Sequence, residues 1–165
     1  MILSENFTLE EFIYSPTAIK QGIDNTPTAE HIESIKALVT NVIQPIRHFL
    51  RQPLKINSGY RHPILNEKIG GAHTIQNGKK VPTSQHCKGE AADLYCAGRN
   101  ADIFRYIKAN LDFDQLIWEF GTDSEPAWVH VSYSKKNRKQ MLKAVKEGGK
   151  TVYKKLWSGG FLSFL

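Results

Sequence analysis

Most of the polar side chains that could perform chemistry lie in three short segments of this 165-residue chain. The segments are residues 58–61, 84–93 and 128–130. They include two histidines, His86 and His130, and the carboxylate of Asp93. Two imidazoles and one carboxylate can hold a zinc ion while leaving a fourth position for water, which is the arrangement of a catalytic rather than a structural zinc site.

The residues around His86 and Asp93 strengthen this interpretation, because a histidine and an aspartate seven residues apart occur by chance in many proteins. Gly89 permits a backbone turn soon after His86. Ala91 and Ala92 are small enough for a crowded site on a packed strand. Asp93 then lies among apolar residues, where a carboxylate is costly unless a cation or hydrogen bonds offset its burial.

These motifs together resemble the zinc D-Ala-D-Ala carboxypeptidase family of peptidoglycan peptidases, and within it the compact enzymes of bacteriophage lysins and bacterial walls. The pattern Ser-x-His-x-x-Gly-x-Ala-x-Asp occupies residues 84–93, and Trp-x-His follows at 128–130. Further matching motifs lie at residues 7–12, 23–25, 58–63 with Asn66, 70–72 and 114–119. The resemblance covers residues 7–133 and implies the α+β fold shared with the signalling domain of Hedgehog proteins. In that fold N-terminal helices pack on a small, mainly antiparallel sheet that carries a zinc site.

The resemblance implies that one Zn²⁺ ion is bound by His86, Asp93 and His130. Cys87 follows His86 directly, but neighbouring side chains on an extended segment point to opposite faces, so we do not expect both to bind one ion. Cys87 and His73 remain the alternatives should His130 not be a ligand.

Three further residues acquire roles from the resemblance. Arg61 corresponds to an arginine that faces substrate, and a guanidinium suits a peptide carbonyl or terminal carboxylate; its alternative is a surface ion pair. Ser84 is expected to form hydrogen bonds within the site or to orient a ligand, with an ordinary loop serine as the alternative. Trp128 either lines the cleft or packs in the core.

The catalytic base is the point where this chain departs from the family pattern. Several relatives have a glutamate three residues before the last histidine, but this position is Ala127. In a hairpin centred near Asp123, Glu119 would lie opposite Ala127 and could reach the same space, so we favour Glu119 as the base. Glu125 in the turn is the alternative. The missing glutamate also leaves open a non-catalytic, zinc-bearing module that binds the cell wall.

Helices are expected first and strands later, which is an α+β pattern. Helices are predicted over residues 8–14, 28–50 and 100–110, and strands over 54–57, 91–95, 114–119 and 128–133. Pro16 should end the first helix, and Pro45 should kink or divide the second. Residues 66–85 have no hydrophobic period and are interpreted as a loop. Residues 73–83 within it are longer than in close relatives and could form a lip over the cleft.

The net charge of +6 is unevenly distributed. Residues 135–165 contain nine of the 22 basic residues and only one of the 16 acidic residues. We therefore divide the chain into a peptidase domain, residues 1–134, and a basic extension, residues 135–165, whose composition favours a helix up to residue 156. Its aromatic end should pack on the domain, and its lysines should attract anionic wall polymer. No nucleic-acid motif accompanies the charge.

The expected function is hydrolysis of a bond in peptidoglycan stem peptides, as a D-Ala-D-Ala carboxypeptidase or an endopeptidase. The apolar runs are too short to cross a bilayer, and the first residues do not resemble a signal peptide. We therefore expect a monomer that is cytoplasmic as synthesised, with Cys87 and Cys96 reduced. A phage or prophage lysin of this kind would reach the wall after release of the holin type.

Overall fold

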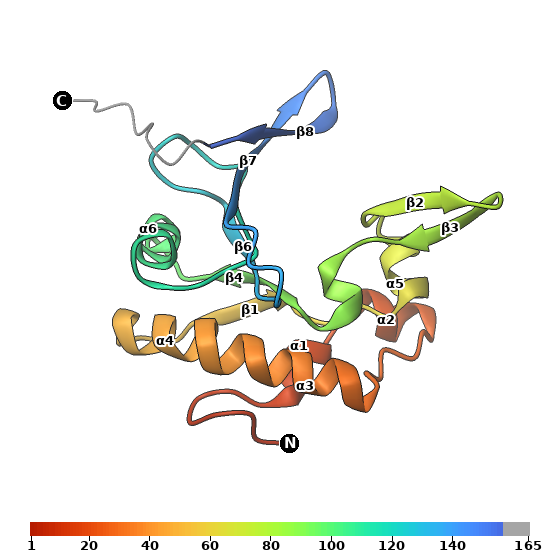
Figure 1. Cartoon of the computed structure of the whole chain (residues 1–165), viewed down its shortest axis with the longest axis horizontal. Helices are drawn as coiled ribbons and strands as arrows, with labels where there is room; N and C mark the ends of the chain where they lie inside the picture. Colours follow the sequence, from red (N-terminus) through yellow and green to blue (C-terminus); the bar gives the residue numbers. More distant parts are fainter. Residues whose placement is uncertain (157–165) are drawn as a thin grey trace.

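The computed structural model describes residues 1–156, with the helices of the N-terminal third on one side of the molecule and a six-stranded sheet above them (Figure 1). The helical segments are α1 (Leu9–Ile13), α2 (Pro16–Gln21), α3 (Ala29–Leu38), the π-helical η1 (Val39–Ile43), α4 (Gln44–Leu50), α5 (Pro63–Lys68), the 3₁₀ turn η2 (Gln85–Lys88) and α6 (Asn100–Asn110). The strands are β1 (Lys55–Ser58), β2 (His73–Gln76), β3 (Lys79–Pro82), β4 (Ala91–Tyr95), β5 (Gln115–Glu119), β6 (Trp128–Ser132), β7 (Gln140–Glu147) and β8 (Lys150–Lys155). The α+β prediction is confirmed. No helix within residues 1–156 is long and apolar enough to cross a membrane.

The predicted helix over residues 28–50 is present and is interrupted as expected. Thr28 caps α3, and the helix continues through η1 into α4, where Pro45 occupies the first turn. Proline has no N–H to donate within a helix, which is consistent with the change of helical type before it. Pro16 does end α1, but it also begins a second helix, α2, because proline is favourable at a first helical position.

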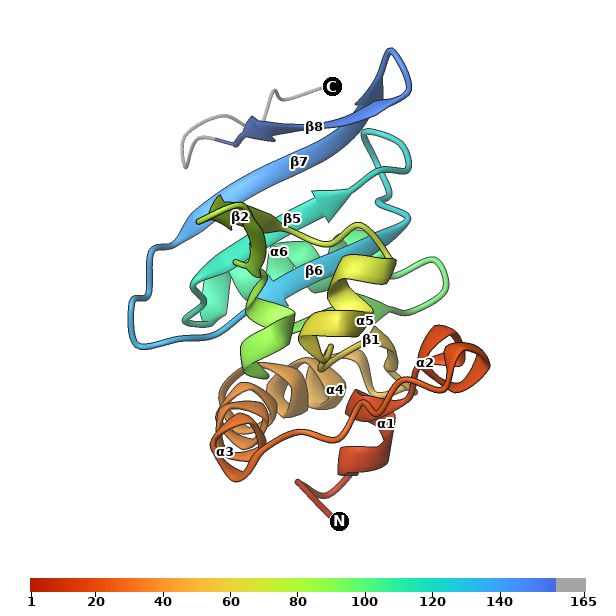
Figure 2. The same ribbon diagram turned by 90° about the vertical axis from the view of Figure 1, so that its right-hand side faces the viewer.

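The main sheet has the strand order β1-β4-β6-β5-β7-β8, and only the β5–β7 pair is parallel. Leu116 and Trp118 of β5 point into the core formed with α6, where the rings of Phe104 and Trp118 lie 5.4 Å apart. The opposite face of the sheet, which carries Ile117 and Glu119, is open toward α5 and the β2–β3 hairpin (Figure 2). Strand alternation therefore separates a packed face from a face that can hold a site.

The predicted hairpin between β5 and β6 is present, but its register differs by one residue from our expectation. Glu119 pairs with Trp128, not with Ala127. Eight residues separate the two paired positions, so the turn is centred between Asp123 and Ser124. A shift of one residue exchanges the faces of a strand, and the observed register puts Glu119 on the same face as His130.

The expected helix in the basic extension is wrong, because residues 140–155 form a β-hairpin. β7 lies parallel to β5 along its first five residues, and β8 pairs with β7. Gly148 and Gly149 have φ angles of 55° and 78° and form the tight turn between the two strands. Pairing with β5 and burial of Leu142 and Ala144 override the helix propensity of this lysine-rich segment. The division at residue 134 stays a prediction, and the aromatic end, residues 157–165, lies outside the described residues.

The expected loop over residues 66–85 is also wrong in part. Its beginning completes α5, and residues 73–82 form the hairpin of β2 and β3. The turn consists of Asn77 and Gly78, with φ angles of 49° and 73°, which is the Asn-Gly signal of a two-residue hairpin turn. This hairpin projects from the body of the molecule beside α5 (Figure 1).

Candidate active site

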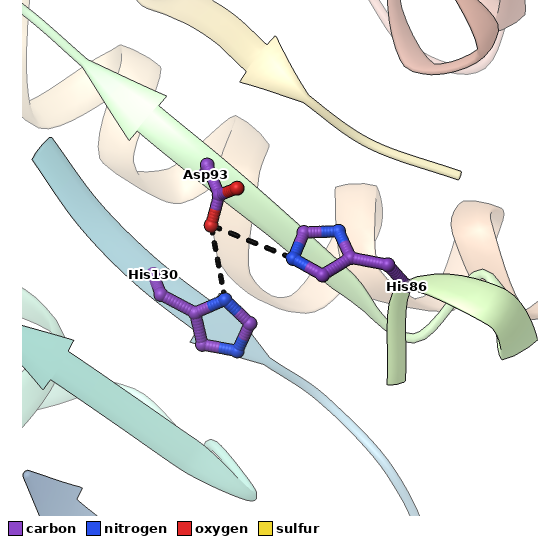
Figure 3. A group of neighbouring side chains, drawn as sticks. All are labelled: His86, Asp93 and His130. Atoms are coloured by element: carbon purple, nitrogen blue, oxygen red, sulfur yellow. Dashed lines mark hydrogen bonds and ion pairs between the residues drawn. The ribbon is translucent and has the colours of Figure 1, made fainter. Parts of the chain in front are cut away.

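Three potential metal donors converge on the open face of the sheet (Figure 3). Asp93 on β4 pairs directly with His130 on β6, so the pleat turns both side chains to the same face. His86 comes from η2, which ends at Gly89 with φ 68° immediately before β4. One nitrogen or oxygen atom from each of the three buried residues lies within 4.8 Å of the others.

The hydrogen bonds of the histidines orient them toward the carboxylate. Asp93 Oδ1 lies 3.0 Å from His130 Nδ1 and 3.5 Å from His86 Nε2. On the other side of its ring, His86 Nδ1 lies 2.7 Å from the carbonyl oxygen of Gly59, so this nitrogen carries the proton and donates it. His86 Nε2 is then free to act as a ligand, the arrangement in which a backbone carbonyl fixes the tautomer of a metal-binding histidine.

Steric crowding explains why residue 59, in the Ser-Gly-Tyr-Arg motif at 58–61, is a glycine. A Cβ atom on Gly59 would lie 2.5 Å from the carbonyl oxygen of Phe12, so only glycine allows these two segments of the backbone to approach so closely. Because the carbonyl of Gly59 also accepts the hydrogen bond from His86, the same position fixes the α1 segment and the candidate ligand.

The donor set fits a zinc ion. His130 Nε2 is buried and has no hydrogen-bond partner among the described residues, and an unpaired buried polar atom is unfavourable. Burial lowers the pKa of His86, which favours the neutral ring that metals bind. Two imidazoles and one carboxylate match the preference of catalytic zinc. His86, Asp93 and His130 can therefore hold the ion, as the resemblance implied.

Arg61 lies against the carboxylate of this triad. Its Nη2 donates to Asp93 Oδ2 at 2.7 Å, and its Nε donates to Ser58 Oγ at 2.8 Å. Burial opposes ionisation of Asp93, but the charges and hydrogen bonds of His86 and His130 hold its pKa well below its usual range. Arg61 thus forms a partly buried ion pair with a candidate ligand while also lining the cavity.

Glu119 lies on the same face, two residues along β5 from the residue that pairs with His130. Its side chain is buried, and only 6% of the residue is exposed. Burial raises the pKa of Glu119 to about 7; His130 opposes this increase and the Asp93 charge adds to it. A carboxylate with such a pKa is suited to exchange protons near neutral pH.

Glu125, the alternative base, is engaged elsewhere. Its two carboxylate oxygens accept hydrogen bonds from the backbone N–H groups of Asn100 and Ala101 at 2.8 and 3.1 Å. It therefore satisfies the N-terminus of α6, where a negative charge is favourable, and does not line the cavity of the triad.

The structure also separates the other candidates. Ser84 and Trp128 line the cavity of the triad, and Trp128 lies with its ring 5.3 Å from that of Phe120. Cys87 is buried outside this cavity, and burial raises the pKa of its thiol to about 11. His73 is exposed at the base of the β2–β3 hairpin and does not approach the triad.

A cavity of about 500 Å³ lies over the triad and extends along the sheet. It is lined by Arg61, Ser84, His86, Asp93, Glu119, Trp128 and His130, and also by Arg138, Leu142, Thr151 and Tyr153 of the basic extension. The last four residues were not predicted to be near the site. The alternating Thr, Val and Tyr at residues 151–153 are a strand signal that could have suggested it.

The peptidase M15 family matches residues 5–132, which is most of the chain and includes every candidate ligand. The chain belongs to the peptidase M15 family. A search of curated proteins finds no match. Membership confirms the resemblance to zinc D-Ala-D-Ala carboxypeptidases, and with the buried triad it makes the protein a metallopeptidase of a zinc-dependent family whose substrate is peptidoglycan. The match ends before β7, so the strands of the extension lie outside it.

Proposed function

We propose that this peptidase cleaves a peptide bond within the short stem peptides of peptidoglycan, as a carboxypeptidase or an endopeptidase. The observation that carries the proposal is the position of Glu119 beside the buried triad, on the same sheet face and in the same cavity. One zinc ion, held by the triad, would acidify a water molecule and polarise the scissile carbonyl.

Glu119 is the general base in this proposal. Its carboxylate accepts the proton of the attacking water and then delivers it to the nitrogen of the leaving amine. A bound dication would favour the ionised form and so lower the pKa of Glu119 from about 7. The absence of a glutamate at Ala127, which left a non-catalytic module open, is offset because Glu119 reaches the cavity from the neighbouring strand.

Arg61 holds the substrate. Asp93 and Ser58 fix one edge of its guanidinium, and its remaining N–H groups can donate to a peptide carbonyl or a terminal carboxylate. Two residues from His130 on β6, the indole of Trp128 gives the cavity an apolar surface that suits the methyl groups of alanine.

The test is incubation of defined muropeptides with zinc-loaded protein, with products identified by mass spectrometry. New amines should appear at one bond, and the mass of the products assigns it to the D-Ala-D-Ala linkage, the L-Ala-D-Glu linkage or a cross-bridge. Glu119→Gln should bind zinc and release nothing. If the unaltered protein holds one zinc ion and releases no amine, hydrolysis of stem peptides is ruled out.

We also propose that the protein acts as a phage or prophage lysin, made in the cytoplasm and released to the wall by a holin. The resemblance to compact lysin enzymes supports this. Expression in a bacterial host should cause lysis only when a holin is expressed with it. Lysis without the holin, or none with it, would contradict this role.

A further inference from the structure

The β7–β8 hairpin brings a tyrosine to the same face of the sheet as the metal triad. Glu119 on β5 pairs with Ala144 on β7, and Ala144 pairs with Tyr153 on β8. Paired residues share a face, so Tyr153 lies in one row with Glu119, two strands or about 10 Å away. The small side chain of Ala144 lies between them in this row and is fully buried.

Tyr153 lines the cavity of the triad together with Thr151 and Leu142. Its side chain is half exposed, at 53%, and no described residue forms a hydrogen bond with its hydroxyl group. Burial raises the pKa of Tyr153, and the charges of Glu119 and Asp93 add to the increase, in keeping with its place above the same cavity. An aromatic side chain at the edge of a reactive cavity, with no hydrogen-bond partner for its hydroxyl group among residues 1–156, is available to a ligand.

The β7–β8 hairpin, which carries Tyr153, is part of the sheet and is also fixed by side-chain contacts. Ile117, Leu142 and Ala144 form a small apolar cluster, on which the ring of Phe120 packs. Lys146 lies with its Nζ 5.3 Å from the centre of the Phe120 ring and donates a hydrogen bond of 2.8 Å to Thr151. Leu142, Phe120 and Thr151 all line the cavity, so this wall is formed before any ligand arrives.

We propose that Tyr153 forms a substrate subsite of the peptidase, in which its ring packs against a stem-peptide residue remote from the scissile bond. This inference rests on the proposed function. Arg61 contacts Asp93 on β4, and four strand spacings of about 4.8 Å separate β4 from β8. An extended peptide that reaches from Arg61 to Tyr153 must therefore contain roughly five or six residues at ~3.4 Å each. Tyr153 thus selects for longer stem peptides and contributes little to the binding of a dipeptide.

The experiment compares a five-residue stem peptide with D-Ala-D-Ala and L-Ala-D-Glu dipeptides. Binding is measured by calorimetry on full-length, zinc-loaded Glu119→Gln protein, which should retain the substrate uncleaved, and turnover is measured on protein with Glu119 intact. Tyr153→Ala should weaken binding of the pentapeptide about tenfold, the effect of losing one packed aromatic ring, and should change dipeptide binding less than twofold. In turnover the loss should appear in KM and not in kcat.

The controls separate the ring from the hydroxyl and from general damage. Tyr153→Phe should bind the pentapeptide within threefold of the parent protein. Lys154→Ala, on the opposite face of β8, and Tyr14→Ala, an exposed tyrosine in the N-terminal region, should leave pentapeptide binding unchanged. Zinc content and melting temperature should be the same in all variants.

The outcomes distinguish this subsite from the proposed hydrolysis. If the protein with Glu119 intact cleaves no peptide, but Tyr153→Ala still weakens binding of the pentapeptide and not of the dipeptides, the subsite is supported and the proposed hydrolysis is wrong. Equal effects on both peptide lengths, no effect on either, or no pentapeptide binding to the parent protein would each overturn the subsite. A loss in Tyr153→Phe as large as in Tyr153→Ala would overturn the packing role of the ring.

Discussion

The central strands of the sheet and its β7–β8 end use the same face in different ways. On β4, β6 and β5 the site residues Asp93, His130 and Glu119 are each less than 10% exposed. On β8 Tyr153 is half exposed and carries no hydrogen bond to a described residue. Metal ligation requires buried, mutually oriented donors, whereas a subsite must leave its surface to the ligand. One face of a sheet can therefore keep the reacting groups and a surface for substrate choice on different strands. The family match covers the strands of the reacting groups and ends before β7.

The largest effect is expected from removing a metal ligand. His86→Ala, Asp93→Ala and His130→Ala should each abolish stoichiometric zinc binding and activity, because three protein ligands leave no redundancy. Asp93→Ala should also reduce stability most, since it leaves Arg61 without its buried partner. Zinc content is measured by atomic absorption after dialysis, and the matched control is His48→Ala, an exposed histidine. Tightly bound zinc in His130→Ala would show that the ligand set is wrong.

Truncation after Ser134 is expected to be nearly as damaging, because it removes β7 from its place beside β5. The cut would expose Ile117 and the unpaired edge of β5 under the site. Thermal unfolding should show a melting temperature at least 10 °C lower, and cleavage of soluble muropeptides and of intact walls should fall together. A truncated protein that cleaves soluble muropeptides normally would show that the extension is independent of the catalytic fold.

Replacement of Glu119 should separate catalysis from metal binding. Glu119→Gln should lower kcat at least a hundredfold and keep the zinc content, because the base is lost while the ligands remain. In metal-free protein the same change should increase stability at pH 8 by about 3 kcal/mol, since the pKa of the buried acid is about 7 against an ordinary value of 4.5.

The sign of this stability change follows from the raised pKa of Glu119. The glutamate imposes no penalty below pH 4.5, a growing penalty as the pH rises from 4.5 to 7, and a constant one above that. Urea unfolding of both proteins at pH 4 and pH 8 measures the difference. If the difference in unfolding free energy between the two proteins is the same at pH 4 and pH 8, Glu119 is in contact with solvent.

The central site was predictable from sequence, and the β7–β8 end was not, for a physical reason. Asp93 and His130 lie in motifs that resemble a known family when taken together, and alternation on β4 and β6 puts them on one face. The segment Met141–Val145 has good helix formers, and only its pairing with β5 makes it a strand. The sequence of residues 141–145 by itself does not indicate that this segment pairs with β5. The position of Glu119 was predicted with a register one residue off, because a loop of unknown shape sets the pairing.

A smaller effect on stability is expected where the central strands meet the β7–β8 end of the sheet. Asp114 is fully buried and accepts hydrogen bonds from Arg138 through its backbone N–H and its guanidinium, at 2.6 to 2.9 Å. Although burial opposes ionisation, these bonds lower the pKa of Asp114 to about 2 from an ordinary 3.8. This contribution to stability is complete above pH 3.8 and is lost as the pH falls through 2.

Asp114→Asn should therefore cost about 2 kcal/mol at pH 7 and much less near pH 2. Chemical unfolding at several pH values gives the comparison, and Asp112→Asn, an exposed aspartate paired with Lys139, is the matched control. A loss at pH 7 that persists unchanged at pH 2 would mean that the amide fails to fit the site for reasons other than charge.

The smallest effect is expected on the outer face of the β7–β8 hairpin, where Lys150 and Lys154 point away from the cavity and are exposed. We expect these charges to attract anionic wall polymer, and such surface attraction is screened beyond about 8 Å at physiological ionic strength. The double change Lys150→Gln and Lys154→Gln should slow digestion of intact walls two- to threefold at low salt, leave soluble muropeptides unaffected, and lose its effect as salt rises. Turbidity of purified walls across a salt series measures this. An effect that is independent of salt, or equal on soluble substrate, would show that these lysines contribute to substrate binding in the cavity. The two faces of the hairpin would then not differ in function.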